Sequence, residues 1–176
     1  GCVKEVNVGG FLRVLGSLKS SSISVGGELT SKGPLEAVEV SVGGVMRVVG
    51  DLKVTGELSV GGEVEVNGRL TGVKVSVGGR LKSVFVRADE VKVGGEIETV
   101  GGVCASYIEL GRRGSARGPL MAPKGEVYLR EGAKVEDVYA DFLEAEEDCR
   151  LRNVYVRETV LWDYCCLLYT SDAADD

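Results

Sequence analysis

The chain has 176 residues, of which 44% are apolar and 27% are charged, and its formal net charge is −6. A chain of this length can form one domain with a buried core. Histidine is absent, so the chain cannot supply a Ser–His or Cys–His catalytic pair, a histidine general base or a histidine metal ligand. Most familiar hydrolase and metalloenzyme chemistry is thereby excluded, and we predict a protein that is not an enzyme and has no cofactor, metal or catalytic residue.

Glycine and valine dominate the composition. There are 26 glycines, glutamine is absent, and aromatic residues make up only 6% of the chain. Valine favours strands, and glycine favours tight corners. The composition therefore predicts an all-β fold.

A tripeptide repeat organises the first part of the chain. Val-Gly-Gly recurs at nearly constant intervals, beginning at Val8, Val25, Val42, Val60, Val77 and Val93. Within each interval, short alternating stretches such as Val6-x-Val8 and Leu12-x-Val14 place apolar side chains on one face. Three such stretches per interval, separated by glycine-containing corners with positive φ, predict one coil of a β-solenoid with a triangular cross-section.

Stacking of these coils explains the period. Parallel strands one coil apart lie about 4.8 Å from each other, so the six repeated valines are expected to form an internal ladder that only stacked coils can bury. The repeat does not determine the hand of winding. Our prediction is a single-stranded, right-handed parallel β-helix.

The period survives after the Val-Gly-Gly corner is lost. Residues 107–124 have the length of one intervening coil, and a 16-residue spacing then aligns Val127 with Leu143, Ala133 with Cys149, Val135 with Leu151, Val138 with Val154 and Tyr139 with Tyr155. The same alignment predicts two opposite-charge rungs, Arg130 with Glu146 and Glu136 with Arg152. In all, about nine coils of roughly 16 to 18 residues are expected.

The two ends of the chain depart from the repeat. The chain starts at Gly1, already inside the pattern, while Cys166 to Asp176 read CLLYTSDAADD and match one frame of a sequencing-library adapter. We therefore expect a β-solenoid domain over residues 1–165, truncated at both ends, and a non-native tail over residues 166–176. Without the three aspartates of that tail, the net charge of −6 becomes −3.

The cysteines and the charges indicate the setting. Cys2, Cys104, Cys149 and Cys165 have no regular spacing, which argues against a disulfide or zinc framework and favours a reduced, cytoplasmic protein. Lys and Arg are interspersed with Asp and Glu, so no nucleic-acid partner is expected. No apolar run has the length of a membrane span.

Two segments carry residues that are able to bind ligands. Gly111 to Gly118 reads GRRGSARG, and its Arg112, Arg113 and Arg117 could hold a phosphate. It lacks the ending of a P-loop, so a solvated corner is the preferred interpretation. Glu144 to Asp148 reads EAEED and could bind Ca²⁺ weakly, but it matches no calcium-binding loop; we interpret it as a charged outer face.

The outward positions of the strands form two contrasting faces. One is nearly neutral and consists of Asn7, Ser24, Ser41, Ser59, Ser76 and Lys92. The other is charged and consists of Arg13, Thr30, Arg47, Glu65, Lys82 and Glu98. Small neutral side chains allow close approach with little desolvation, so one hypothesis is that the serine face makes lateral contacts between filaments. The alternative is that serine is simply tolerated on an exposed strand.

The coils VSVGGVMRVVGDL from Val40 and their degenerate successors, which contain VEDVY and LRNVY, are similar to those of the bactofilins, over Val6 to about Val160. That resemblance implies a cytoskeletal scaffold that polymerises end to end without nucleotide, with itself as partner and with other scaffold or cell-envelope proteins as further candidates. Membrane association is left open by the resemblance.

Two other classes of solenoid remain as alternatives. Hexapeptide-repeat acyltransferases share a six-residue apolar period, but they use a histidine base, and this chain has five-residue steps at Leu18 to Ile23 and Leu35 to Val40. An extracellular adhesin or ice-binding solenoid would favour a secretion signal or a Thr-x-Thr ladder, and these residues show neither.

Overall fold

The computed structural model describes residues 2–161 and 166–172, and those residues form strands and turns without any helix. The all-β prediction is confirmed. The strands are β1 (Cys2–Val8), β2 (Phe11–Val14), β3 (Leu18–Val25), β4 (Glu28–Ser31), β5 (Leu35–Val42), β6 (Val45–Val48), β7 (Leu52–Val60), β8 (Glu63–Val77), β9 (Arg80–Arg87), β10 (Glu90–Val93), β11 (Glu96–Cys104), β12 (Tyr107–Leu110), β13 (Ser115–Leu129), β14 (Lys134–Ala145), β15 (Arg150–Leu161) and β16 (Cys166–Asp172).

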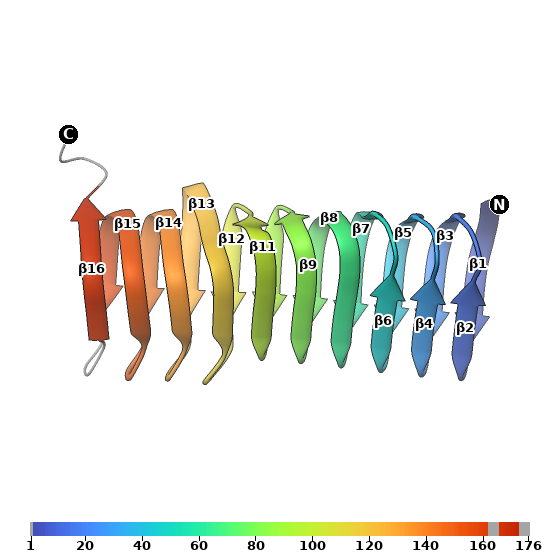
Figure 1. The fold of residues 1–176 in the computed structure, drawn as a ribbon, viewed down its shortest axis with the longest axis horizontal. Coiled ribbons are helices and arrows are strands. Elements are labelled where there is room, and N and C mark those ends of the chain that lie inside the picture. Colours follow the sequence, from blue (N-terminus) through green and yellow to red (C-terminus); the bar gives the residue numbers. More distant parts are fainter. Residues whose placement is uncertain (1, 162–165, 173–176) are drawn as a thin grey trace.

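The chain winds into a straight rod with its two termini at opposite ends (Figure 1). It advances from right to left in this view, with the near strands rising and the far strands descending, which is right-handed winding. Every strand pairs in parallel with its equivalent one coil away. The solenoid prediction is therefore confirmed.

Each coil contributes to three faces. Face A carries the ladder through Val8, face B the ladder through Leu12, and face C the ladder through Leu18. The equivalents of Val8 on face A are Val25, Val42, Val60, Val77, Val93, Leu110, Leu129, Ala145 and Leu161. The predicted valine ladder therefore exists, and it continues beyond the last Val-Gly-Gly corner.

One coil is longer than predicted. Leu110 pairs with Leu129, so the chain takes a longer step between these two rungs than the expected period allows. The extra length is taken up by a turn at Arg112–Arg113 and by a shift of register between Ala122 and Glu126. Both irregularities lie at corners, so the strands on either side keep their stacking.

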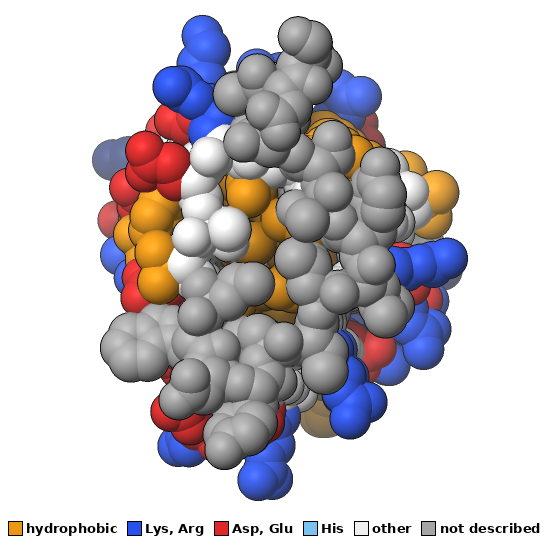
Figure 2. All heavy atoms as spheres, turned by 90° about the vertical axis from the view of Figure 1, so that its left-hand side faces the viewer, with side chains coloured by type: hydrophobic (Ala, Val, Ile, Leu, Met, Phe, Trp, Pro, Cys, Tyr) orange, Lys and Arg blue, Asp and Glu red, His pale blue; other side chains and the backbone are white. Residues whose placement is uncertain are grey.

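A single apolar core runs along the rod. On face B, Leu29, Met46, Val64, Leu81 and Ile97 follow one another in register and have no exposed surface. Burial of each such side chain stabilises the fold by about 1.5–3 kcal/mol. Viewed along the axis, charged side chains surround the outline and apolar ones are visible in the middle (Figure 2).

The Val-Gly-Gly corners need glycine for a reason other than the one expected. Positive φ occurs at Gly50, Gly102, Gly118 and Gly132, and at none of the glycines in the six repeated corners that begin at Val8, Val25, Val42, Val60, Val77 and Val93. The constraint at the corners is steric: a Cβ on Gly27 would lie 2.6 Å from the carbonyl oxygen of Gly10 in the preceding coil. The prediction of positive φ at these corners was wrong, because stacked backbone excludes the side chain instead.

Buried hydroxyl groups occupy the corner that joins faces B and C. Ser31 donates a hydrogen bond to the carbonyl of Gly33 at 2.8 Å, Ser83 to that of Gly68 at 3.0 Å, and Thr99 to that of Arg117 at 3.2 Å. Buried polar groups are costly unless they are hydrogen-bonded. These side chains satisfy carbonyl groups where the strand ladder is interrupted.

The 16-residue alignment of the last coils is confirmed by the strand register. Val127 pairs with Leu143, Val135 with Leu151, and Val138 with Val154. Cys149 is fully buried, as predicted. Strand β16 lies within residues 166–176 and also continues the stack on β15. Backbone pairing does not depend on the origin of a sequence, so the assignment of residues 166–176 as a non-native tail stays a prediction.

Candidate functional site

The neutral ladder on face A forms as predicted. Asn7, Ser24, Ser41, Ser59, Ser76 and Lys92 occupy successive rungs of the parallel register. Ser41 and Ser59 are exposed, whereas Ser24 and Ser76 are half-buried between their neighbours. This ladder offers a flat strip without charged groups over its serine rungs, and its role in lateral contacts stays a prediction.

Face A changes character toward the C-terminus, where Tyr128 occupies a rung of the serine ladder and packs against Tyr107 and Phe142 of the neighbouring ladder in an aromatic column. Tyr107 and Tyr128 have ring centroids 5.2 Å apart, and those of Tyr128 and Phe142 are 6.0 Å apart. Such pairs contribute about 0.5–1.5 kcal/mol beyond the area that they bury. Sequence reasoning missed this column because one step between its members is longer than the repeat period and the other is shorter.

Hydrogen bonding perturbs one phenol of this column strongly. The hydroxyl of Tyr128 donates to Glu126 at 2.9 Å, and this bond raises the pKa of Tyr128 to about 12. Burial raises the pKa of Tyr107. Both groups thus remain neutral phenols at physiological pH, so the column is a packing element rather than a proton donor or acceptor.

Ion pairs connect the charged ladder of face B within itself and with the adjacent ladder that contains Glu28, Arg80 and Glu96. Arg47 lies 3.3 Å from Glu28 and 4.0 Å from Glu65, and Arg80 lies 3.2 Å from Glu96. The arginines are exposed and the glutamates half-buried, and surface pairs of this kind contribute at most about 1 kcal/mol each. The ladder is therefore an alternating charged surface whose groups neutralise one another.

One of the two predicted opposite-charge rungs forms. Arg130 lies 3.0 Å from Glu146, and it is also 2.6 Å from Glu109 in the opposite direction along the rod. Within the described residues, Glu136 makes no ion pair with Arg152; its carboxylate accepts a hydrogen bond from the amide of Gly118 at 3.2 Å. The carboxylate of Glu136 is therefore bound by the backbone amide of the corner residue Gly118 and not by Arg152, the partner that the alignment predicted.

The structure does not make a phosphate cradle of Gly111–Gly118. The amide of Arg113 donates to the carbonyl of Glu131 and that of Gly114 to the carbonyl of Gly111, at 2.8 and 3.0 Å. Arg112 forms an ion pair of 2.6 Å with Glu131. The amides of the loop are thus used internally, as in the preferred interpretation of this segment as a corner.

The acidic segment Glu144–Asp148 also serves the stacking of coils. Glu146 pairs with Arg130 and accepts a second hydrogen bond from the amide of Glu131 at 3.0 Å. Ala145 points into the core, and Asp148 adopts a positive φ of 58° at the corner. Within residues 2–161 and 166–172, no three Cys, Asp or Glu side chains are grouped as a metal site would need.

The first described coil leaves one side of its ladders unpaired. In the described residues, β1 pairs only with β3 and β2 only with β4. The inward side chains of this coil are half-buried: Val6, Val8, Leu12 and Leu18. Their equivalents one coil later are at most 1% exposed: Ile23, Val25, Leu29 and Leu35. Covering this edge with another coil would bury that apolar surface.

Comparison with known proteins adds no family to this description. The chain matches no family model, no curated protein and no solved structure. The described residues also contain no helix that could cross a membrane.

Proposed function

We propose that the protein is a non-enzymatic, self-assembling scaffold that polymerises end to end without nucleotide, as the bactofilins do. Its principal partner is another copy of the same chain, and other scaffold or cell-envelope proteins are further candidates. A cytoplasmic location, with or without membrane association, belongs to the same proposal.

The observation that carries this proposal is the constant cross-section of the stack. Parallel pairing continues from β1 to β15, with register shifts confined to short irregularities. The positions stacked on the four inward side chains of the first coil stay apolar apart from Thr159, which follows Leu143 in β15. A parallel edge with free N–H and C=O groups pairs readily with another strand. A second copy can therefore extend the stack with no change in its own fold.

Burial supplies the driving force for such a junction. Among the described residues, Leu12 is half-buried because one side of its coil is uncovered, whereas its equivalent Leu29, with a coil on each side, is fully buried. Each apolar side chain covered at the junction stabilises it by up to about 1.5–3 kcal/mol. The four inward side chains of this coil, Val6, Val8, Leu12 and Leu18, all lie where a further coil would cover them.

Electron microscopy of the full-length protein, purified without nucleotide, tests the proposal. We expect filaments one rod wide, and diffraction from aligned filaments should show a repeat of about 4.7–4.8 Å along the axis. Discrete trimers would instead indicate the acyltransferase class. A protein that stays monomeric at all concentrations would refute end-to-end assembly.

A pair of variants locates the junction. Leu12→Glu places a charge in the apolar edge, and we expect it to abolish or shorten the filaments. Phe11→Glu makes the same change of charge at an outward side chain that is 80% exposed on the same strand, and its filaments should persist. Circular dichroism establishes that each variant is folded; a folded Leu12→Glu protein with filaments of normal length would contradict this junction.

A further inference from the structure

A like-charge rung interrupts the alternating charges of face B. Lys134 and Arg150 are directly paired in the register of β14 and β15, so their side chains leave the sheet about 4.8 Å apart. Like charges in opposed positions destabilise a sheet. No ion pair involves either side chain within the described part of the chain, in contrast to Arg47 and Arg80 on the earlier coils.

Two further cations face the same place. A shallow groove of about 470 Å³ crosses β13, β14 and β15, and four cations and one carboxylate line it: Arg117, Lys134, Arg150, Arg152 and Glu136. The four cations are exposed and make no ion pair with described residues. The groove therefore has an excess of three positive charges on a chain whose net charge is −6.

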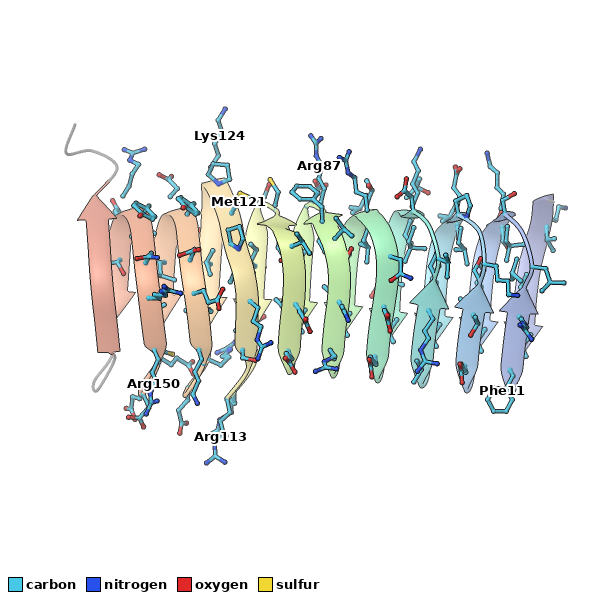
Figure 3. All side chains as sticks on the ribbon, viewed as in Figure 1. Phe11, Arg87, Arg113, Met121, Lys124 and Arg150 are labelled. Carbon is cyan, nitrogen blue, oxygen red and sulfur yellow. The ribbon has the colours of Figure 1, made fainter. Side chains whose placement is uncertain are left out.

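Charged groups around the groove are engaged by other partners, so they do not neutralise its cations. Glu136 is engaged by the amide of Gly118, and Arg112 by Glu131. Arg113 and Arg150 project from the same lower edge of the rod (Figure 3). Local violations of a charge rule that the rest of the face obeys are typical of binding sites.

From these observations we infer that the groove binds a small ligand with two or more linked phosphate groups. Guanidinium groups bind phosphate oxygens in a bidentate fashion, and an ammonium group adds a point charge. The groove spans three coils, or about 10 Å along the axis, and its volume lies in the range of small-molecule sites. A flat anionic membrane fits less well, because Glu63, Glu65, Glu96 and Glu98 lie on the same face nearby.

Titration calorimetry with pyrophosphate at low ionic strength tests this inference. We expect saturable binding that weakens as salt is added. Lys134→Glu should weaken it at least about tenfold, since hydrogen bonds to charged groups are worth that much. The same substitution replaces a repulsive rung by an attractive one with Arg150, so the thermal unfolding midpoint should not fall; this readout separates loss of binding from loss of fold.

Lys124→Glu is the matched control. Lys124 lies on β13 as Arg117 does, is exposed, and projects from the opposite edge of the rod to Arg150 (Figure 3). It changes the net charge equally and should alter the affinity less than about twofold. Equal weakening by both variants would show attraction by net charge alone and would overturn the site, as would the absence of saturable binding to the parent protein.

Vesicles distinguish the two sources of phosphate. Binding to phosphatidylglycerol vesicles that depends on Lys134, without binding to pyrophosphate, would overturn the small-ligand assignment. Pyrophosphate binding with equal, weak retention on phosphatidylglycerol and phosphatidylcholine vesicles would support it. Filament formation by Lys134→Glu is scored separately, so failure of this inference and failure of the scaffold proposal are distinguishable.

Discussion

The coils up to Gly114 and the coils from Leu129 onward share one core but close their A–B corner in two different ways. In the first region, pairs of glycines stack backbone on backbone, and a Cβ on Gly44 would lie 2.5 Å from the carbonyl oxygen of Gly27. In the second region the corner is held by side chains, with Arg130 bridging Glu109 and Glu146. The comparison teaches that loss of a sequence repeat need not mean loss of the structural repeat.

The outer surface changes together with the corner. In the coils with glycine corners, serines form a ladder on face A. Toward the coils whose corners are held by ion pairs, the same face carries the column of Tyr107, Tyr128 and Phe142. Small side chains and bare backbone leave few ways to lock adjacent coils except through the core. Aromatic and charged side chains provide additional contacts between coils, so they tolerate a less regular sequence.

The largest effect is expected from a side chain added to the glycine corner. Gly44→Ala should destabilise the protein by about 2–3 kcal/mol, because the new Cβ forces adjacent coils apart. Gly10→Ala is the matched control in the unassembled protein, since no described atom lies within 4 Å of a Cβ there. At such an open site alanine should be neutral or stabilising by up to about 1 kcal/mol. Urea unfolding measures both; equal destabilisation would refute steric exclusion as the reason for glycine.

A smaller effect is expected at the ion-pair corner. Arg130→Ala removes two short ion pairs and should destabilise the protein by about 1 kcal/mol, with the loss reduced at high salt. Arg157→Ala serves as control, because Arg157 is 69% exposed and makes one pair of 3.3 Å with Asp141. Its effect should stay below about 0.5 kcal/mol. If chemical unfolding gave equal values for both variants, the corner would not depend on Arg130.

The smallest effect concerns the aromatic column and appears only at high pH. Because the pKa of Tyr128 is raised to about 12 by its bond to Glu126, the folded state favours the neutral phenol. Its contribution to stability is complete below pH 10, the usual pKa of tyrosine, and is lost as the pH rises through about 12. Phenolate absorbance should show a tyrosine that titrates near pH 12, which Tyr128→Phe removes and Glu126→Gln shifts toward pH 10. An unshifted titration of Glu126→Gln would contradict this cause.

Much of the fold was predictable because, in a parallel stack, the repeat period is itself the list of contacts. Val8 over Val25 and Val138 over Val154 follow from spacing alone, and the structure confirms both. The coil between Leu110 and Leu129 escaped this reasoning because its irregular corners change the period locally. The partner of Glu136 was not predicted either, because the backbone amide of Gly118 competes with Arg152 for its carboxylate.

The candidate surfaces were predictable to a lesser degree. The serine ladder follows the regular period, whereas the aromatic column and the cationic groove cross the long coil. The groove unites Arg117 with Lys134 and Arg150, and the register of β13 and β14 pairs Ala116 with Val135, which is a longer step than the regular period. A constant period would align Ala116, and with it Arg117, with an earlier residue of the next coil than the structure does. The signal that could have found the groove is the pair of like charges, Lys134 and Arg150, exactly one coil apart in the sequence.

The amino-acid sequence alone determined that this chain winds into a parallel β-stack, because a solenoid brings together residues separated by one period and the period is written in the chain. Only the tertiary structure decided why the corners are glycine, which carboxylate is taken by which donor, and where unpaired cations gather. Those outcomes depend on distances of a few ångströms between coils, and several partners at such distances compete for the same group.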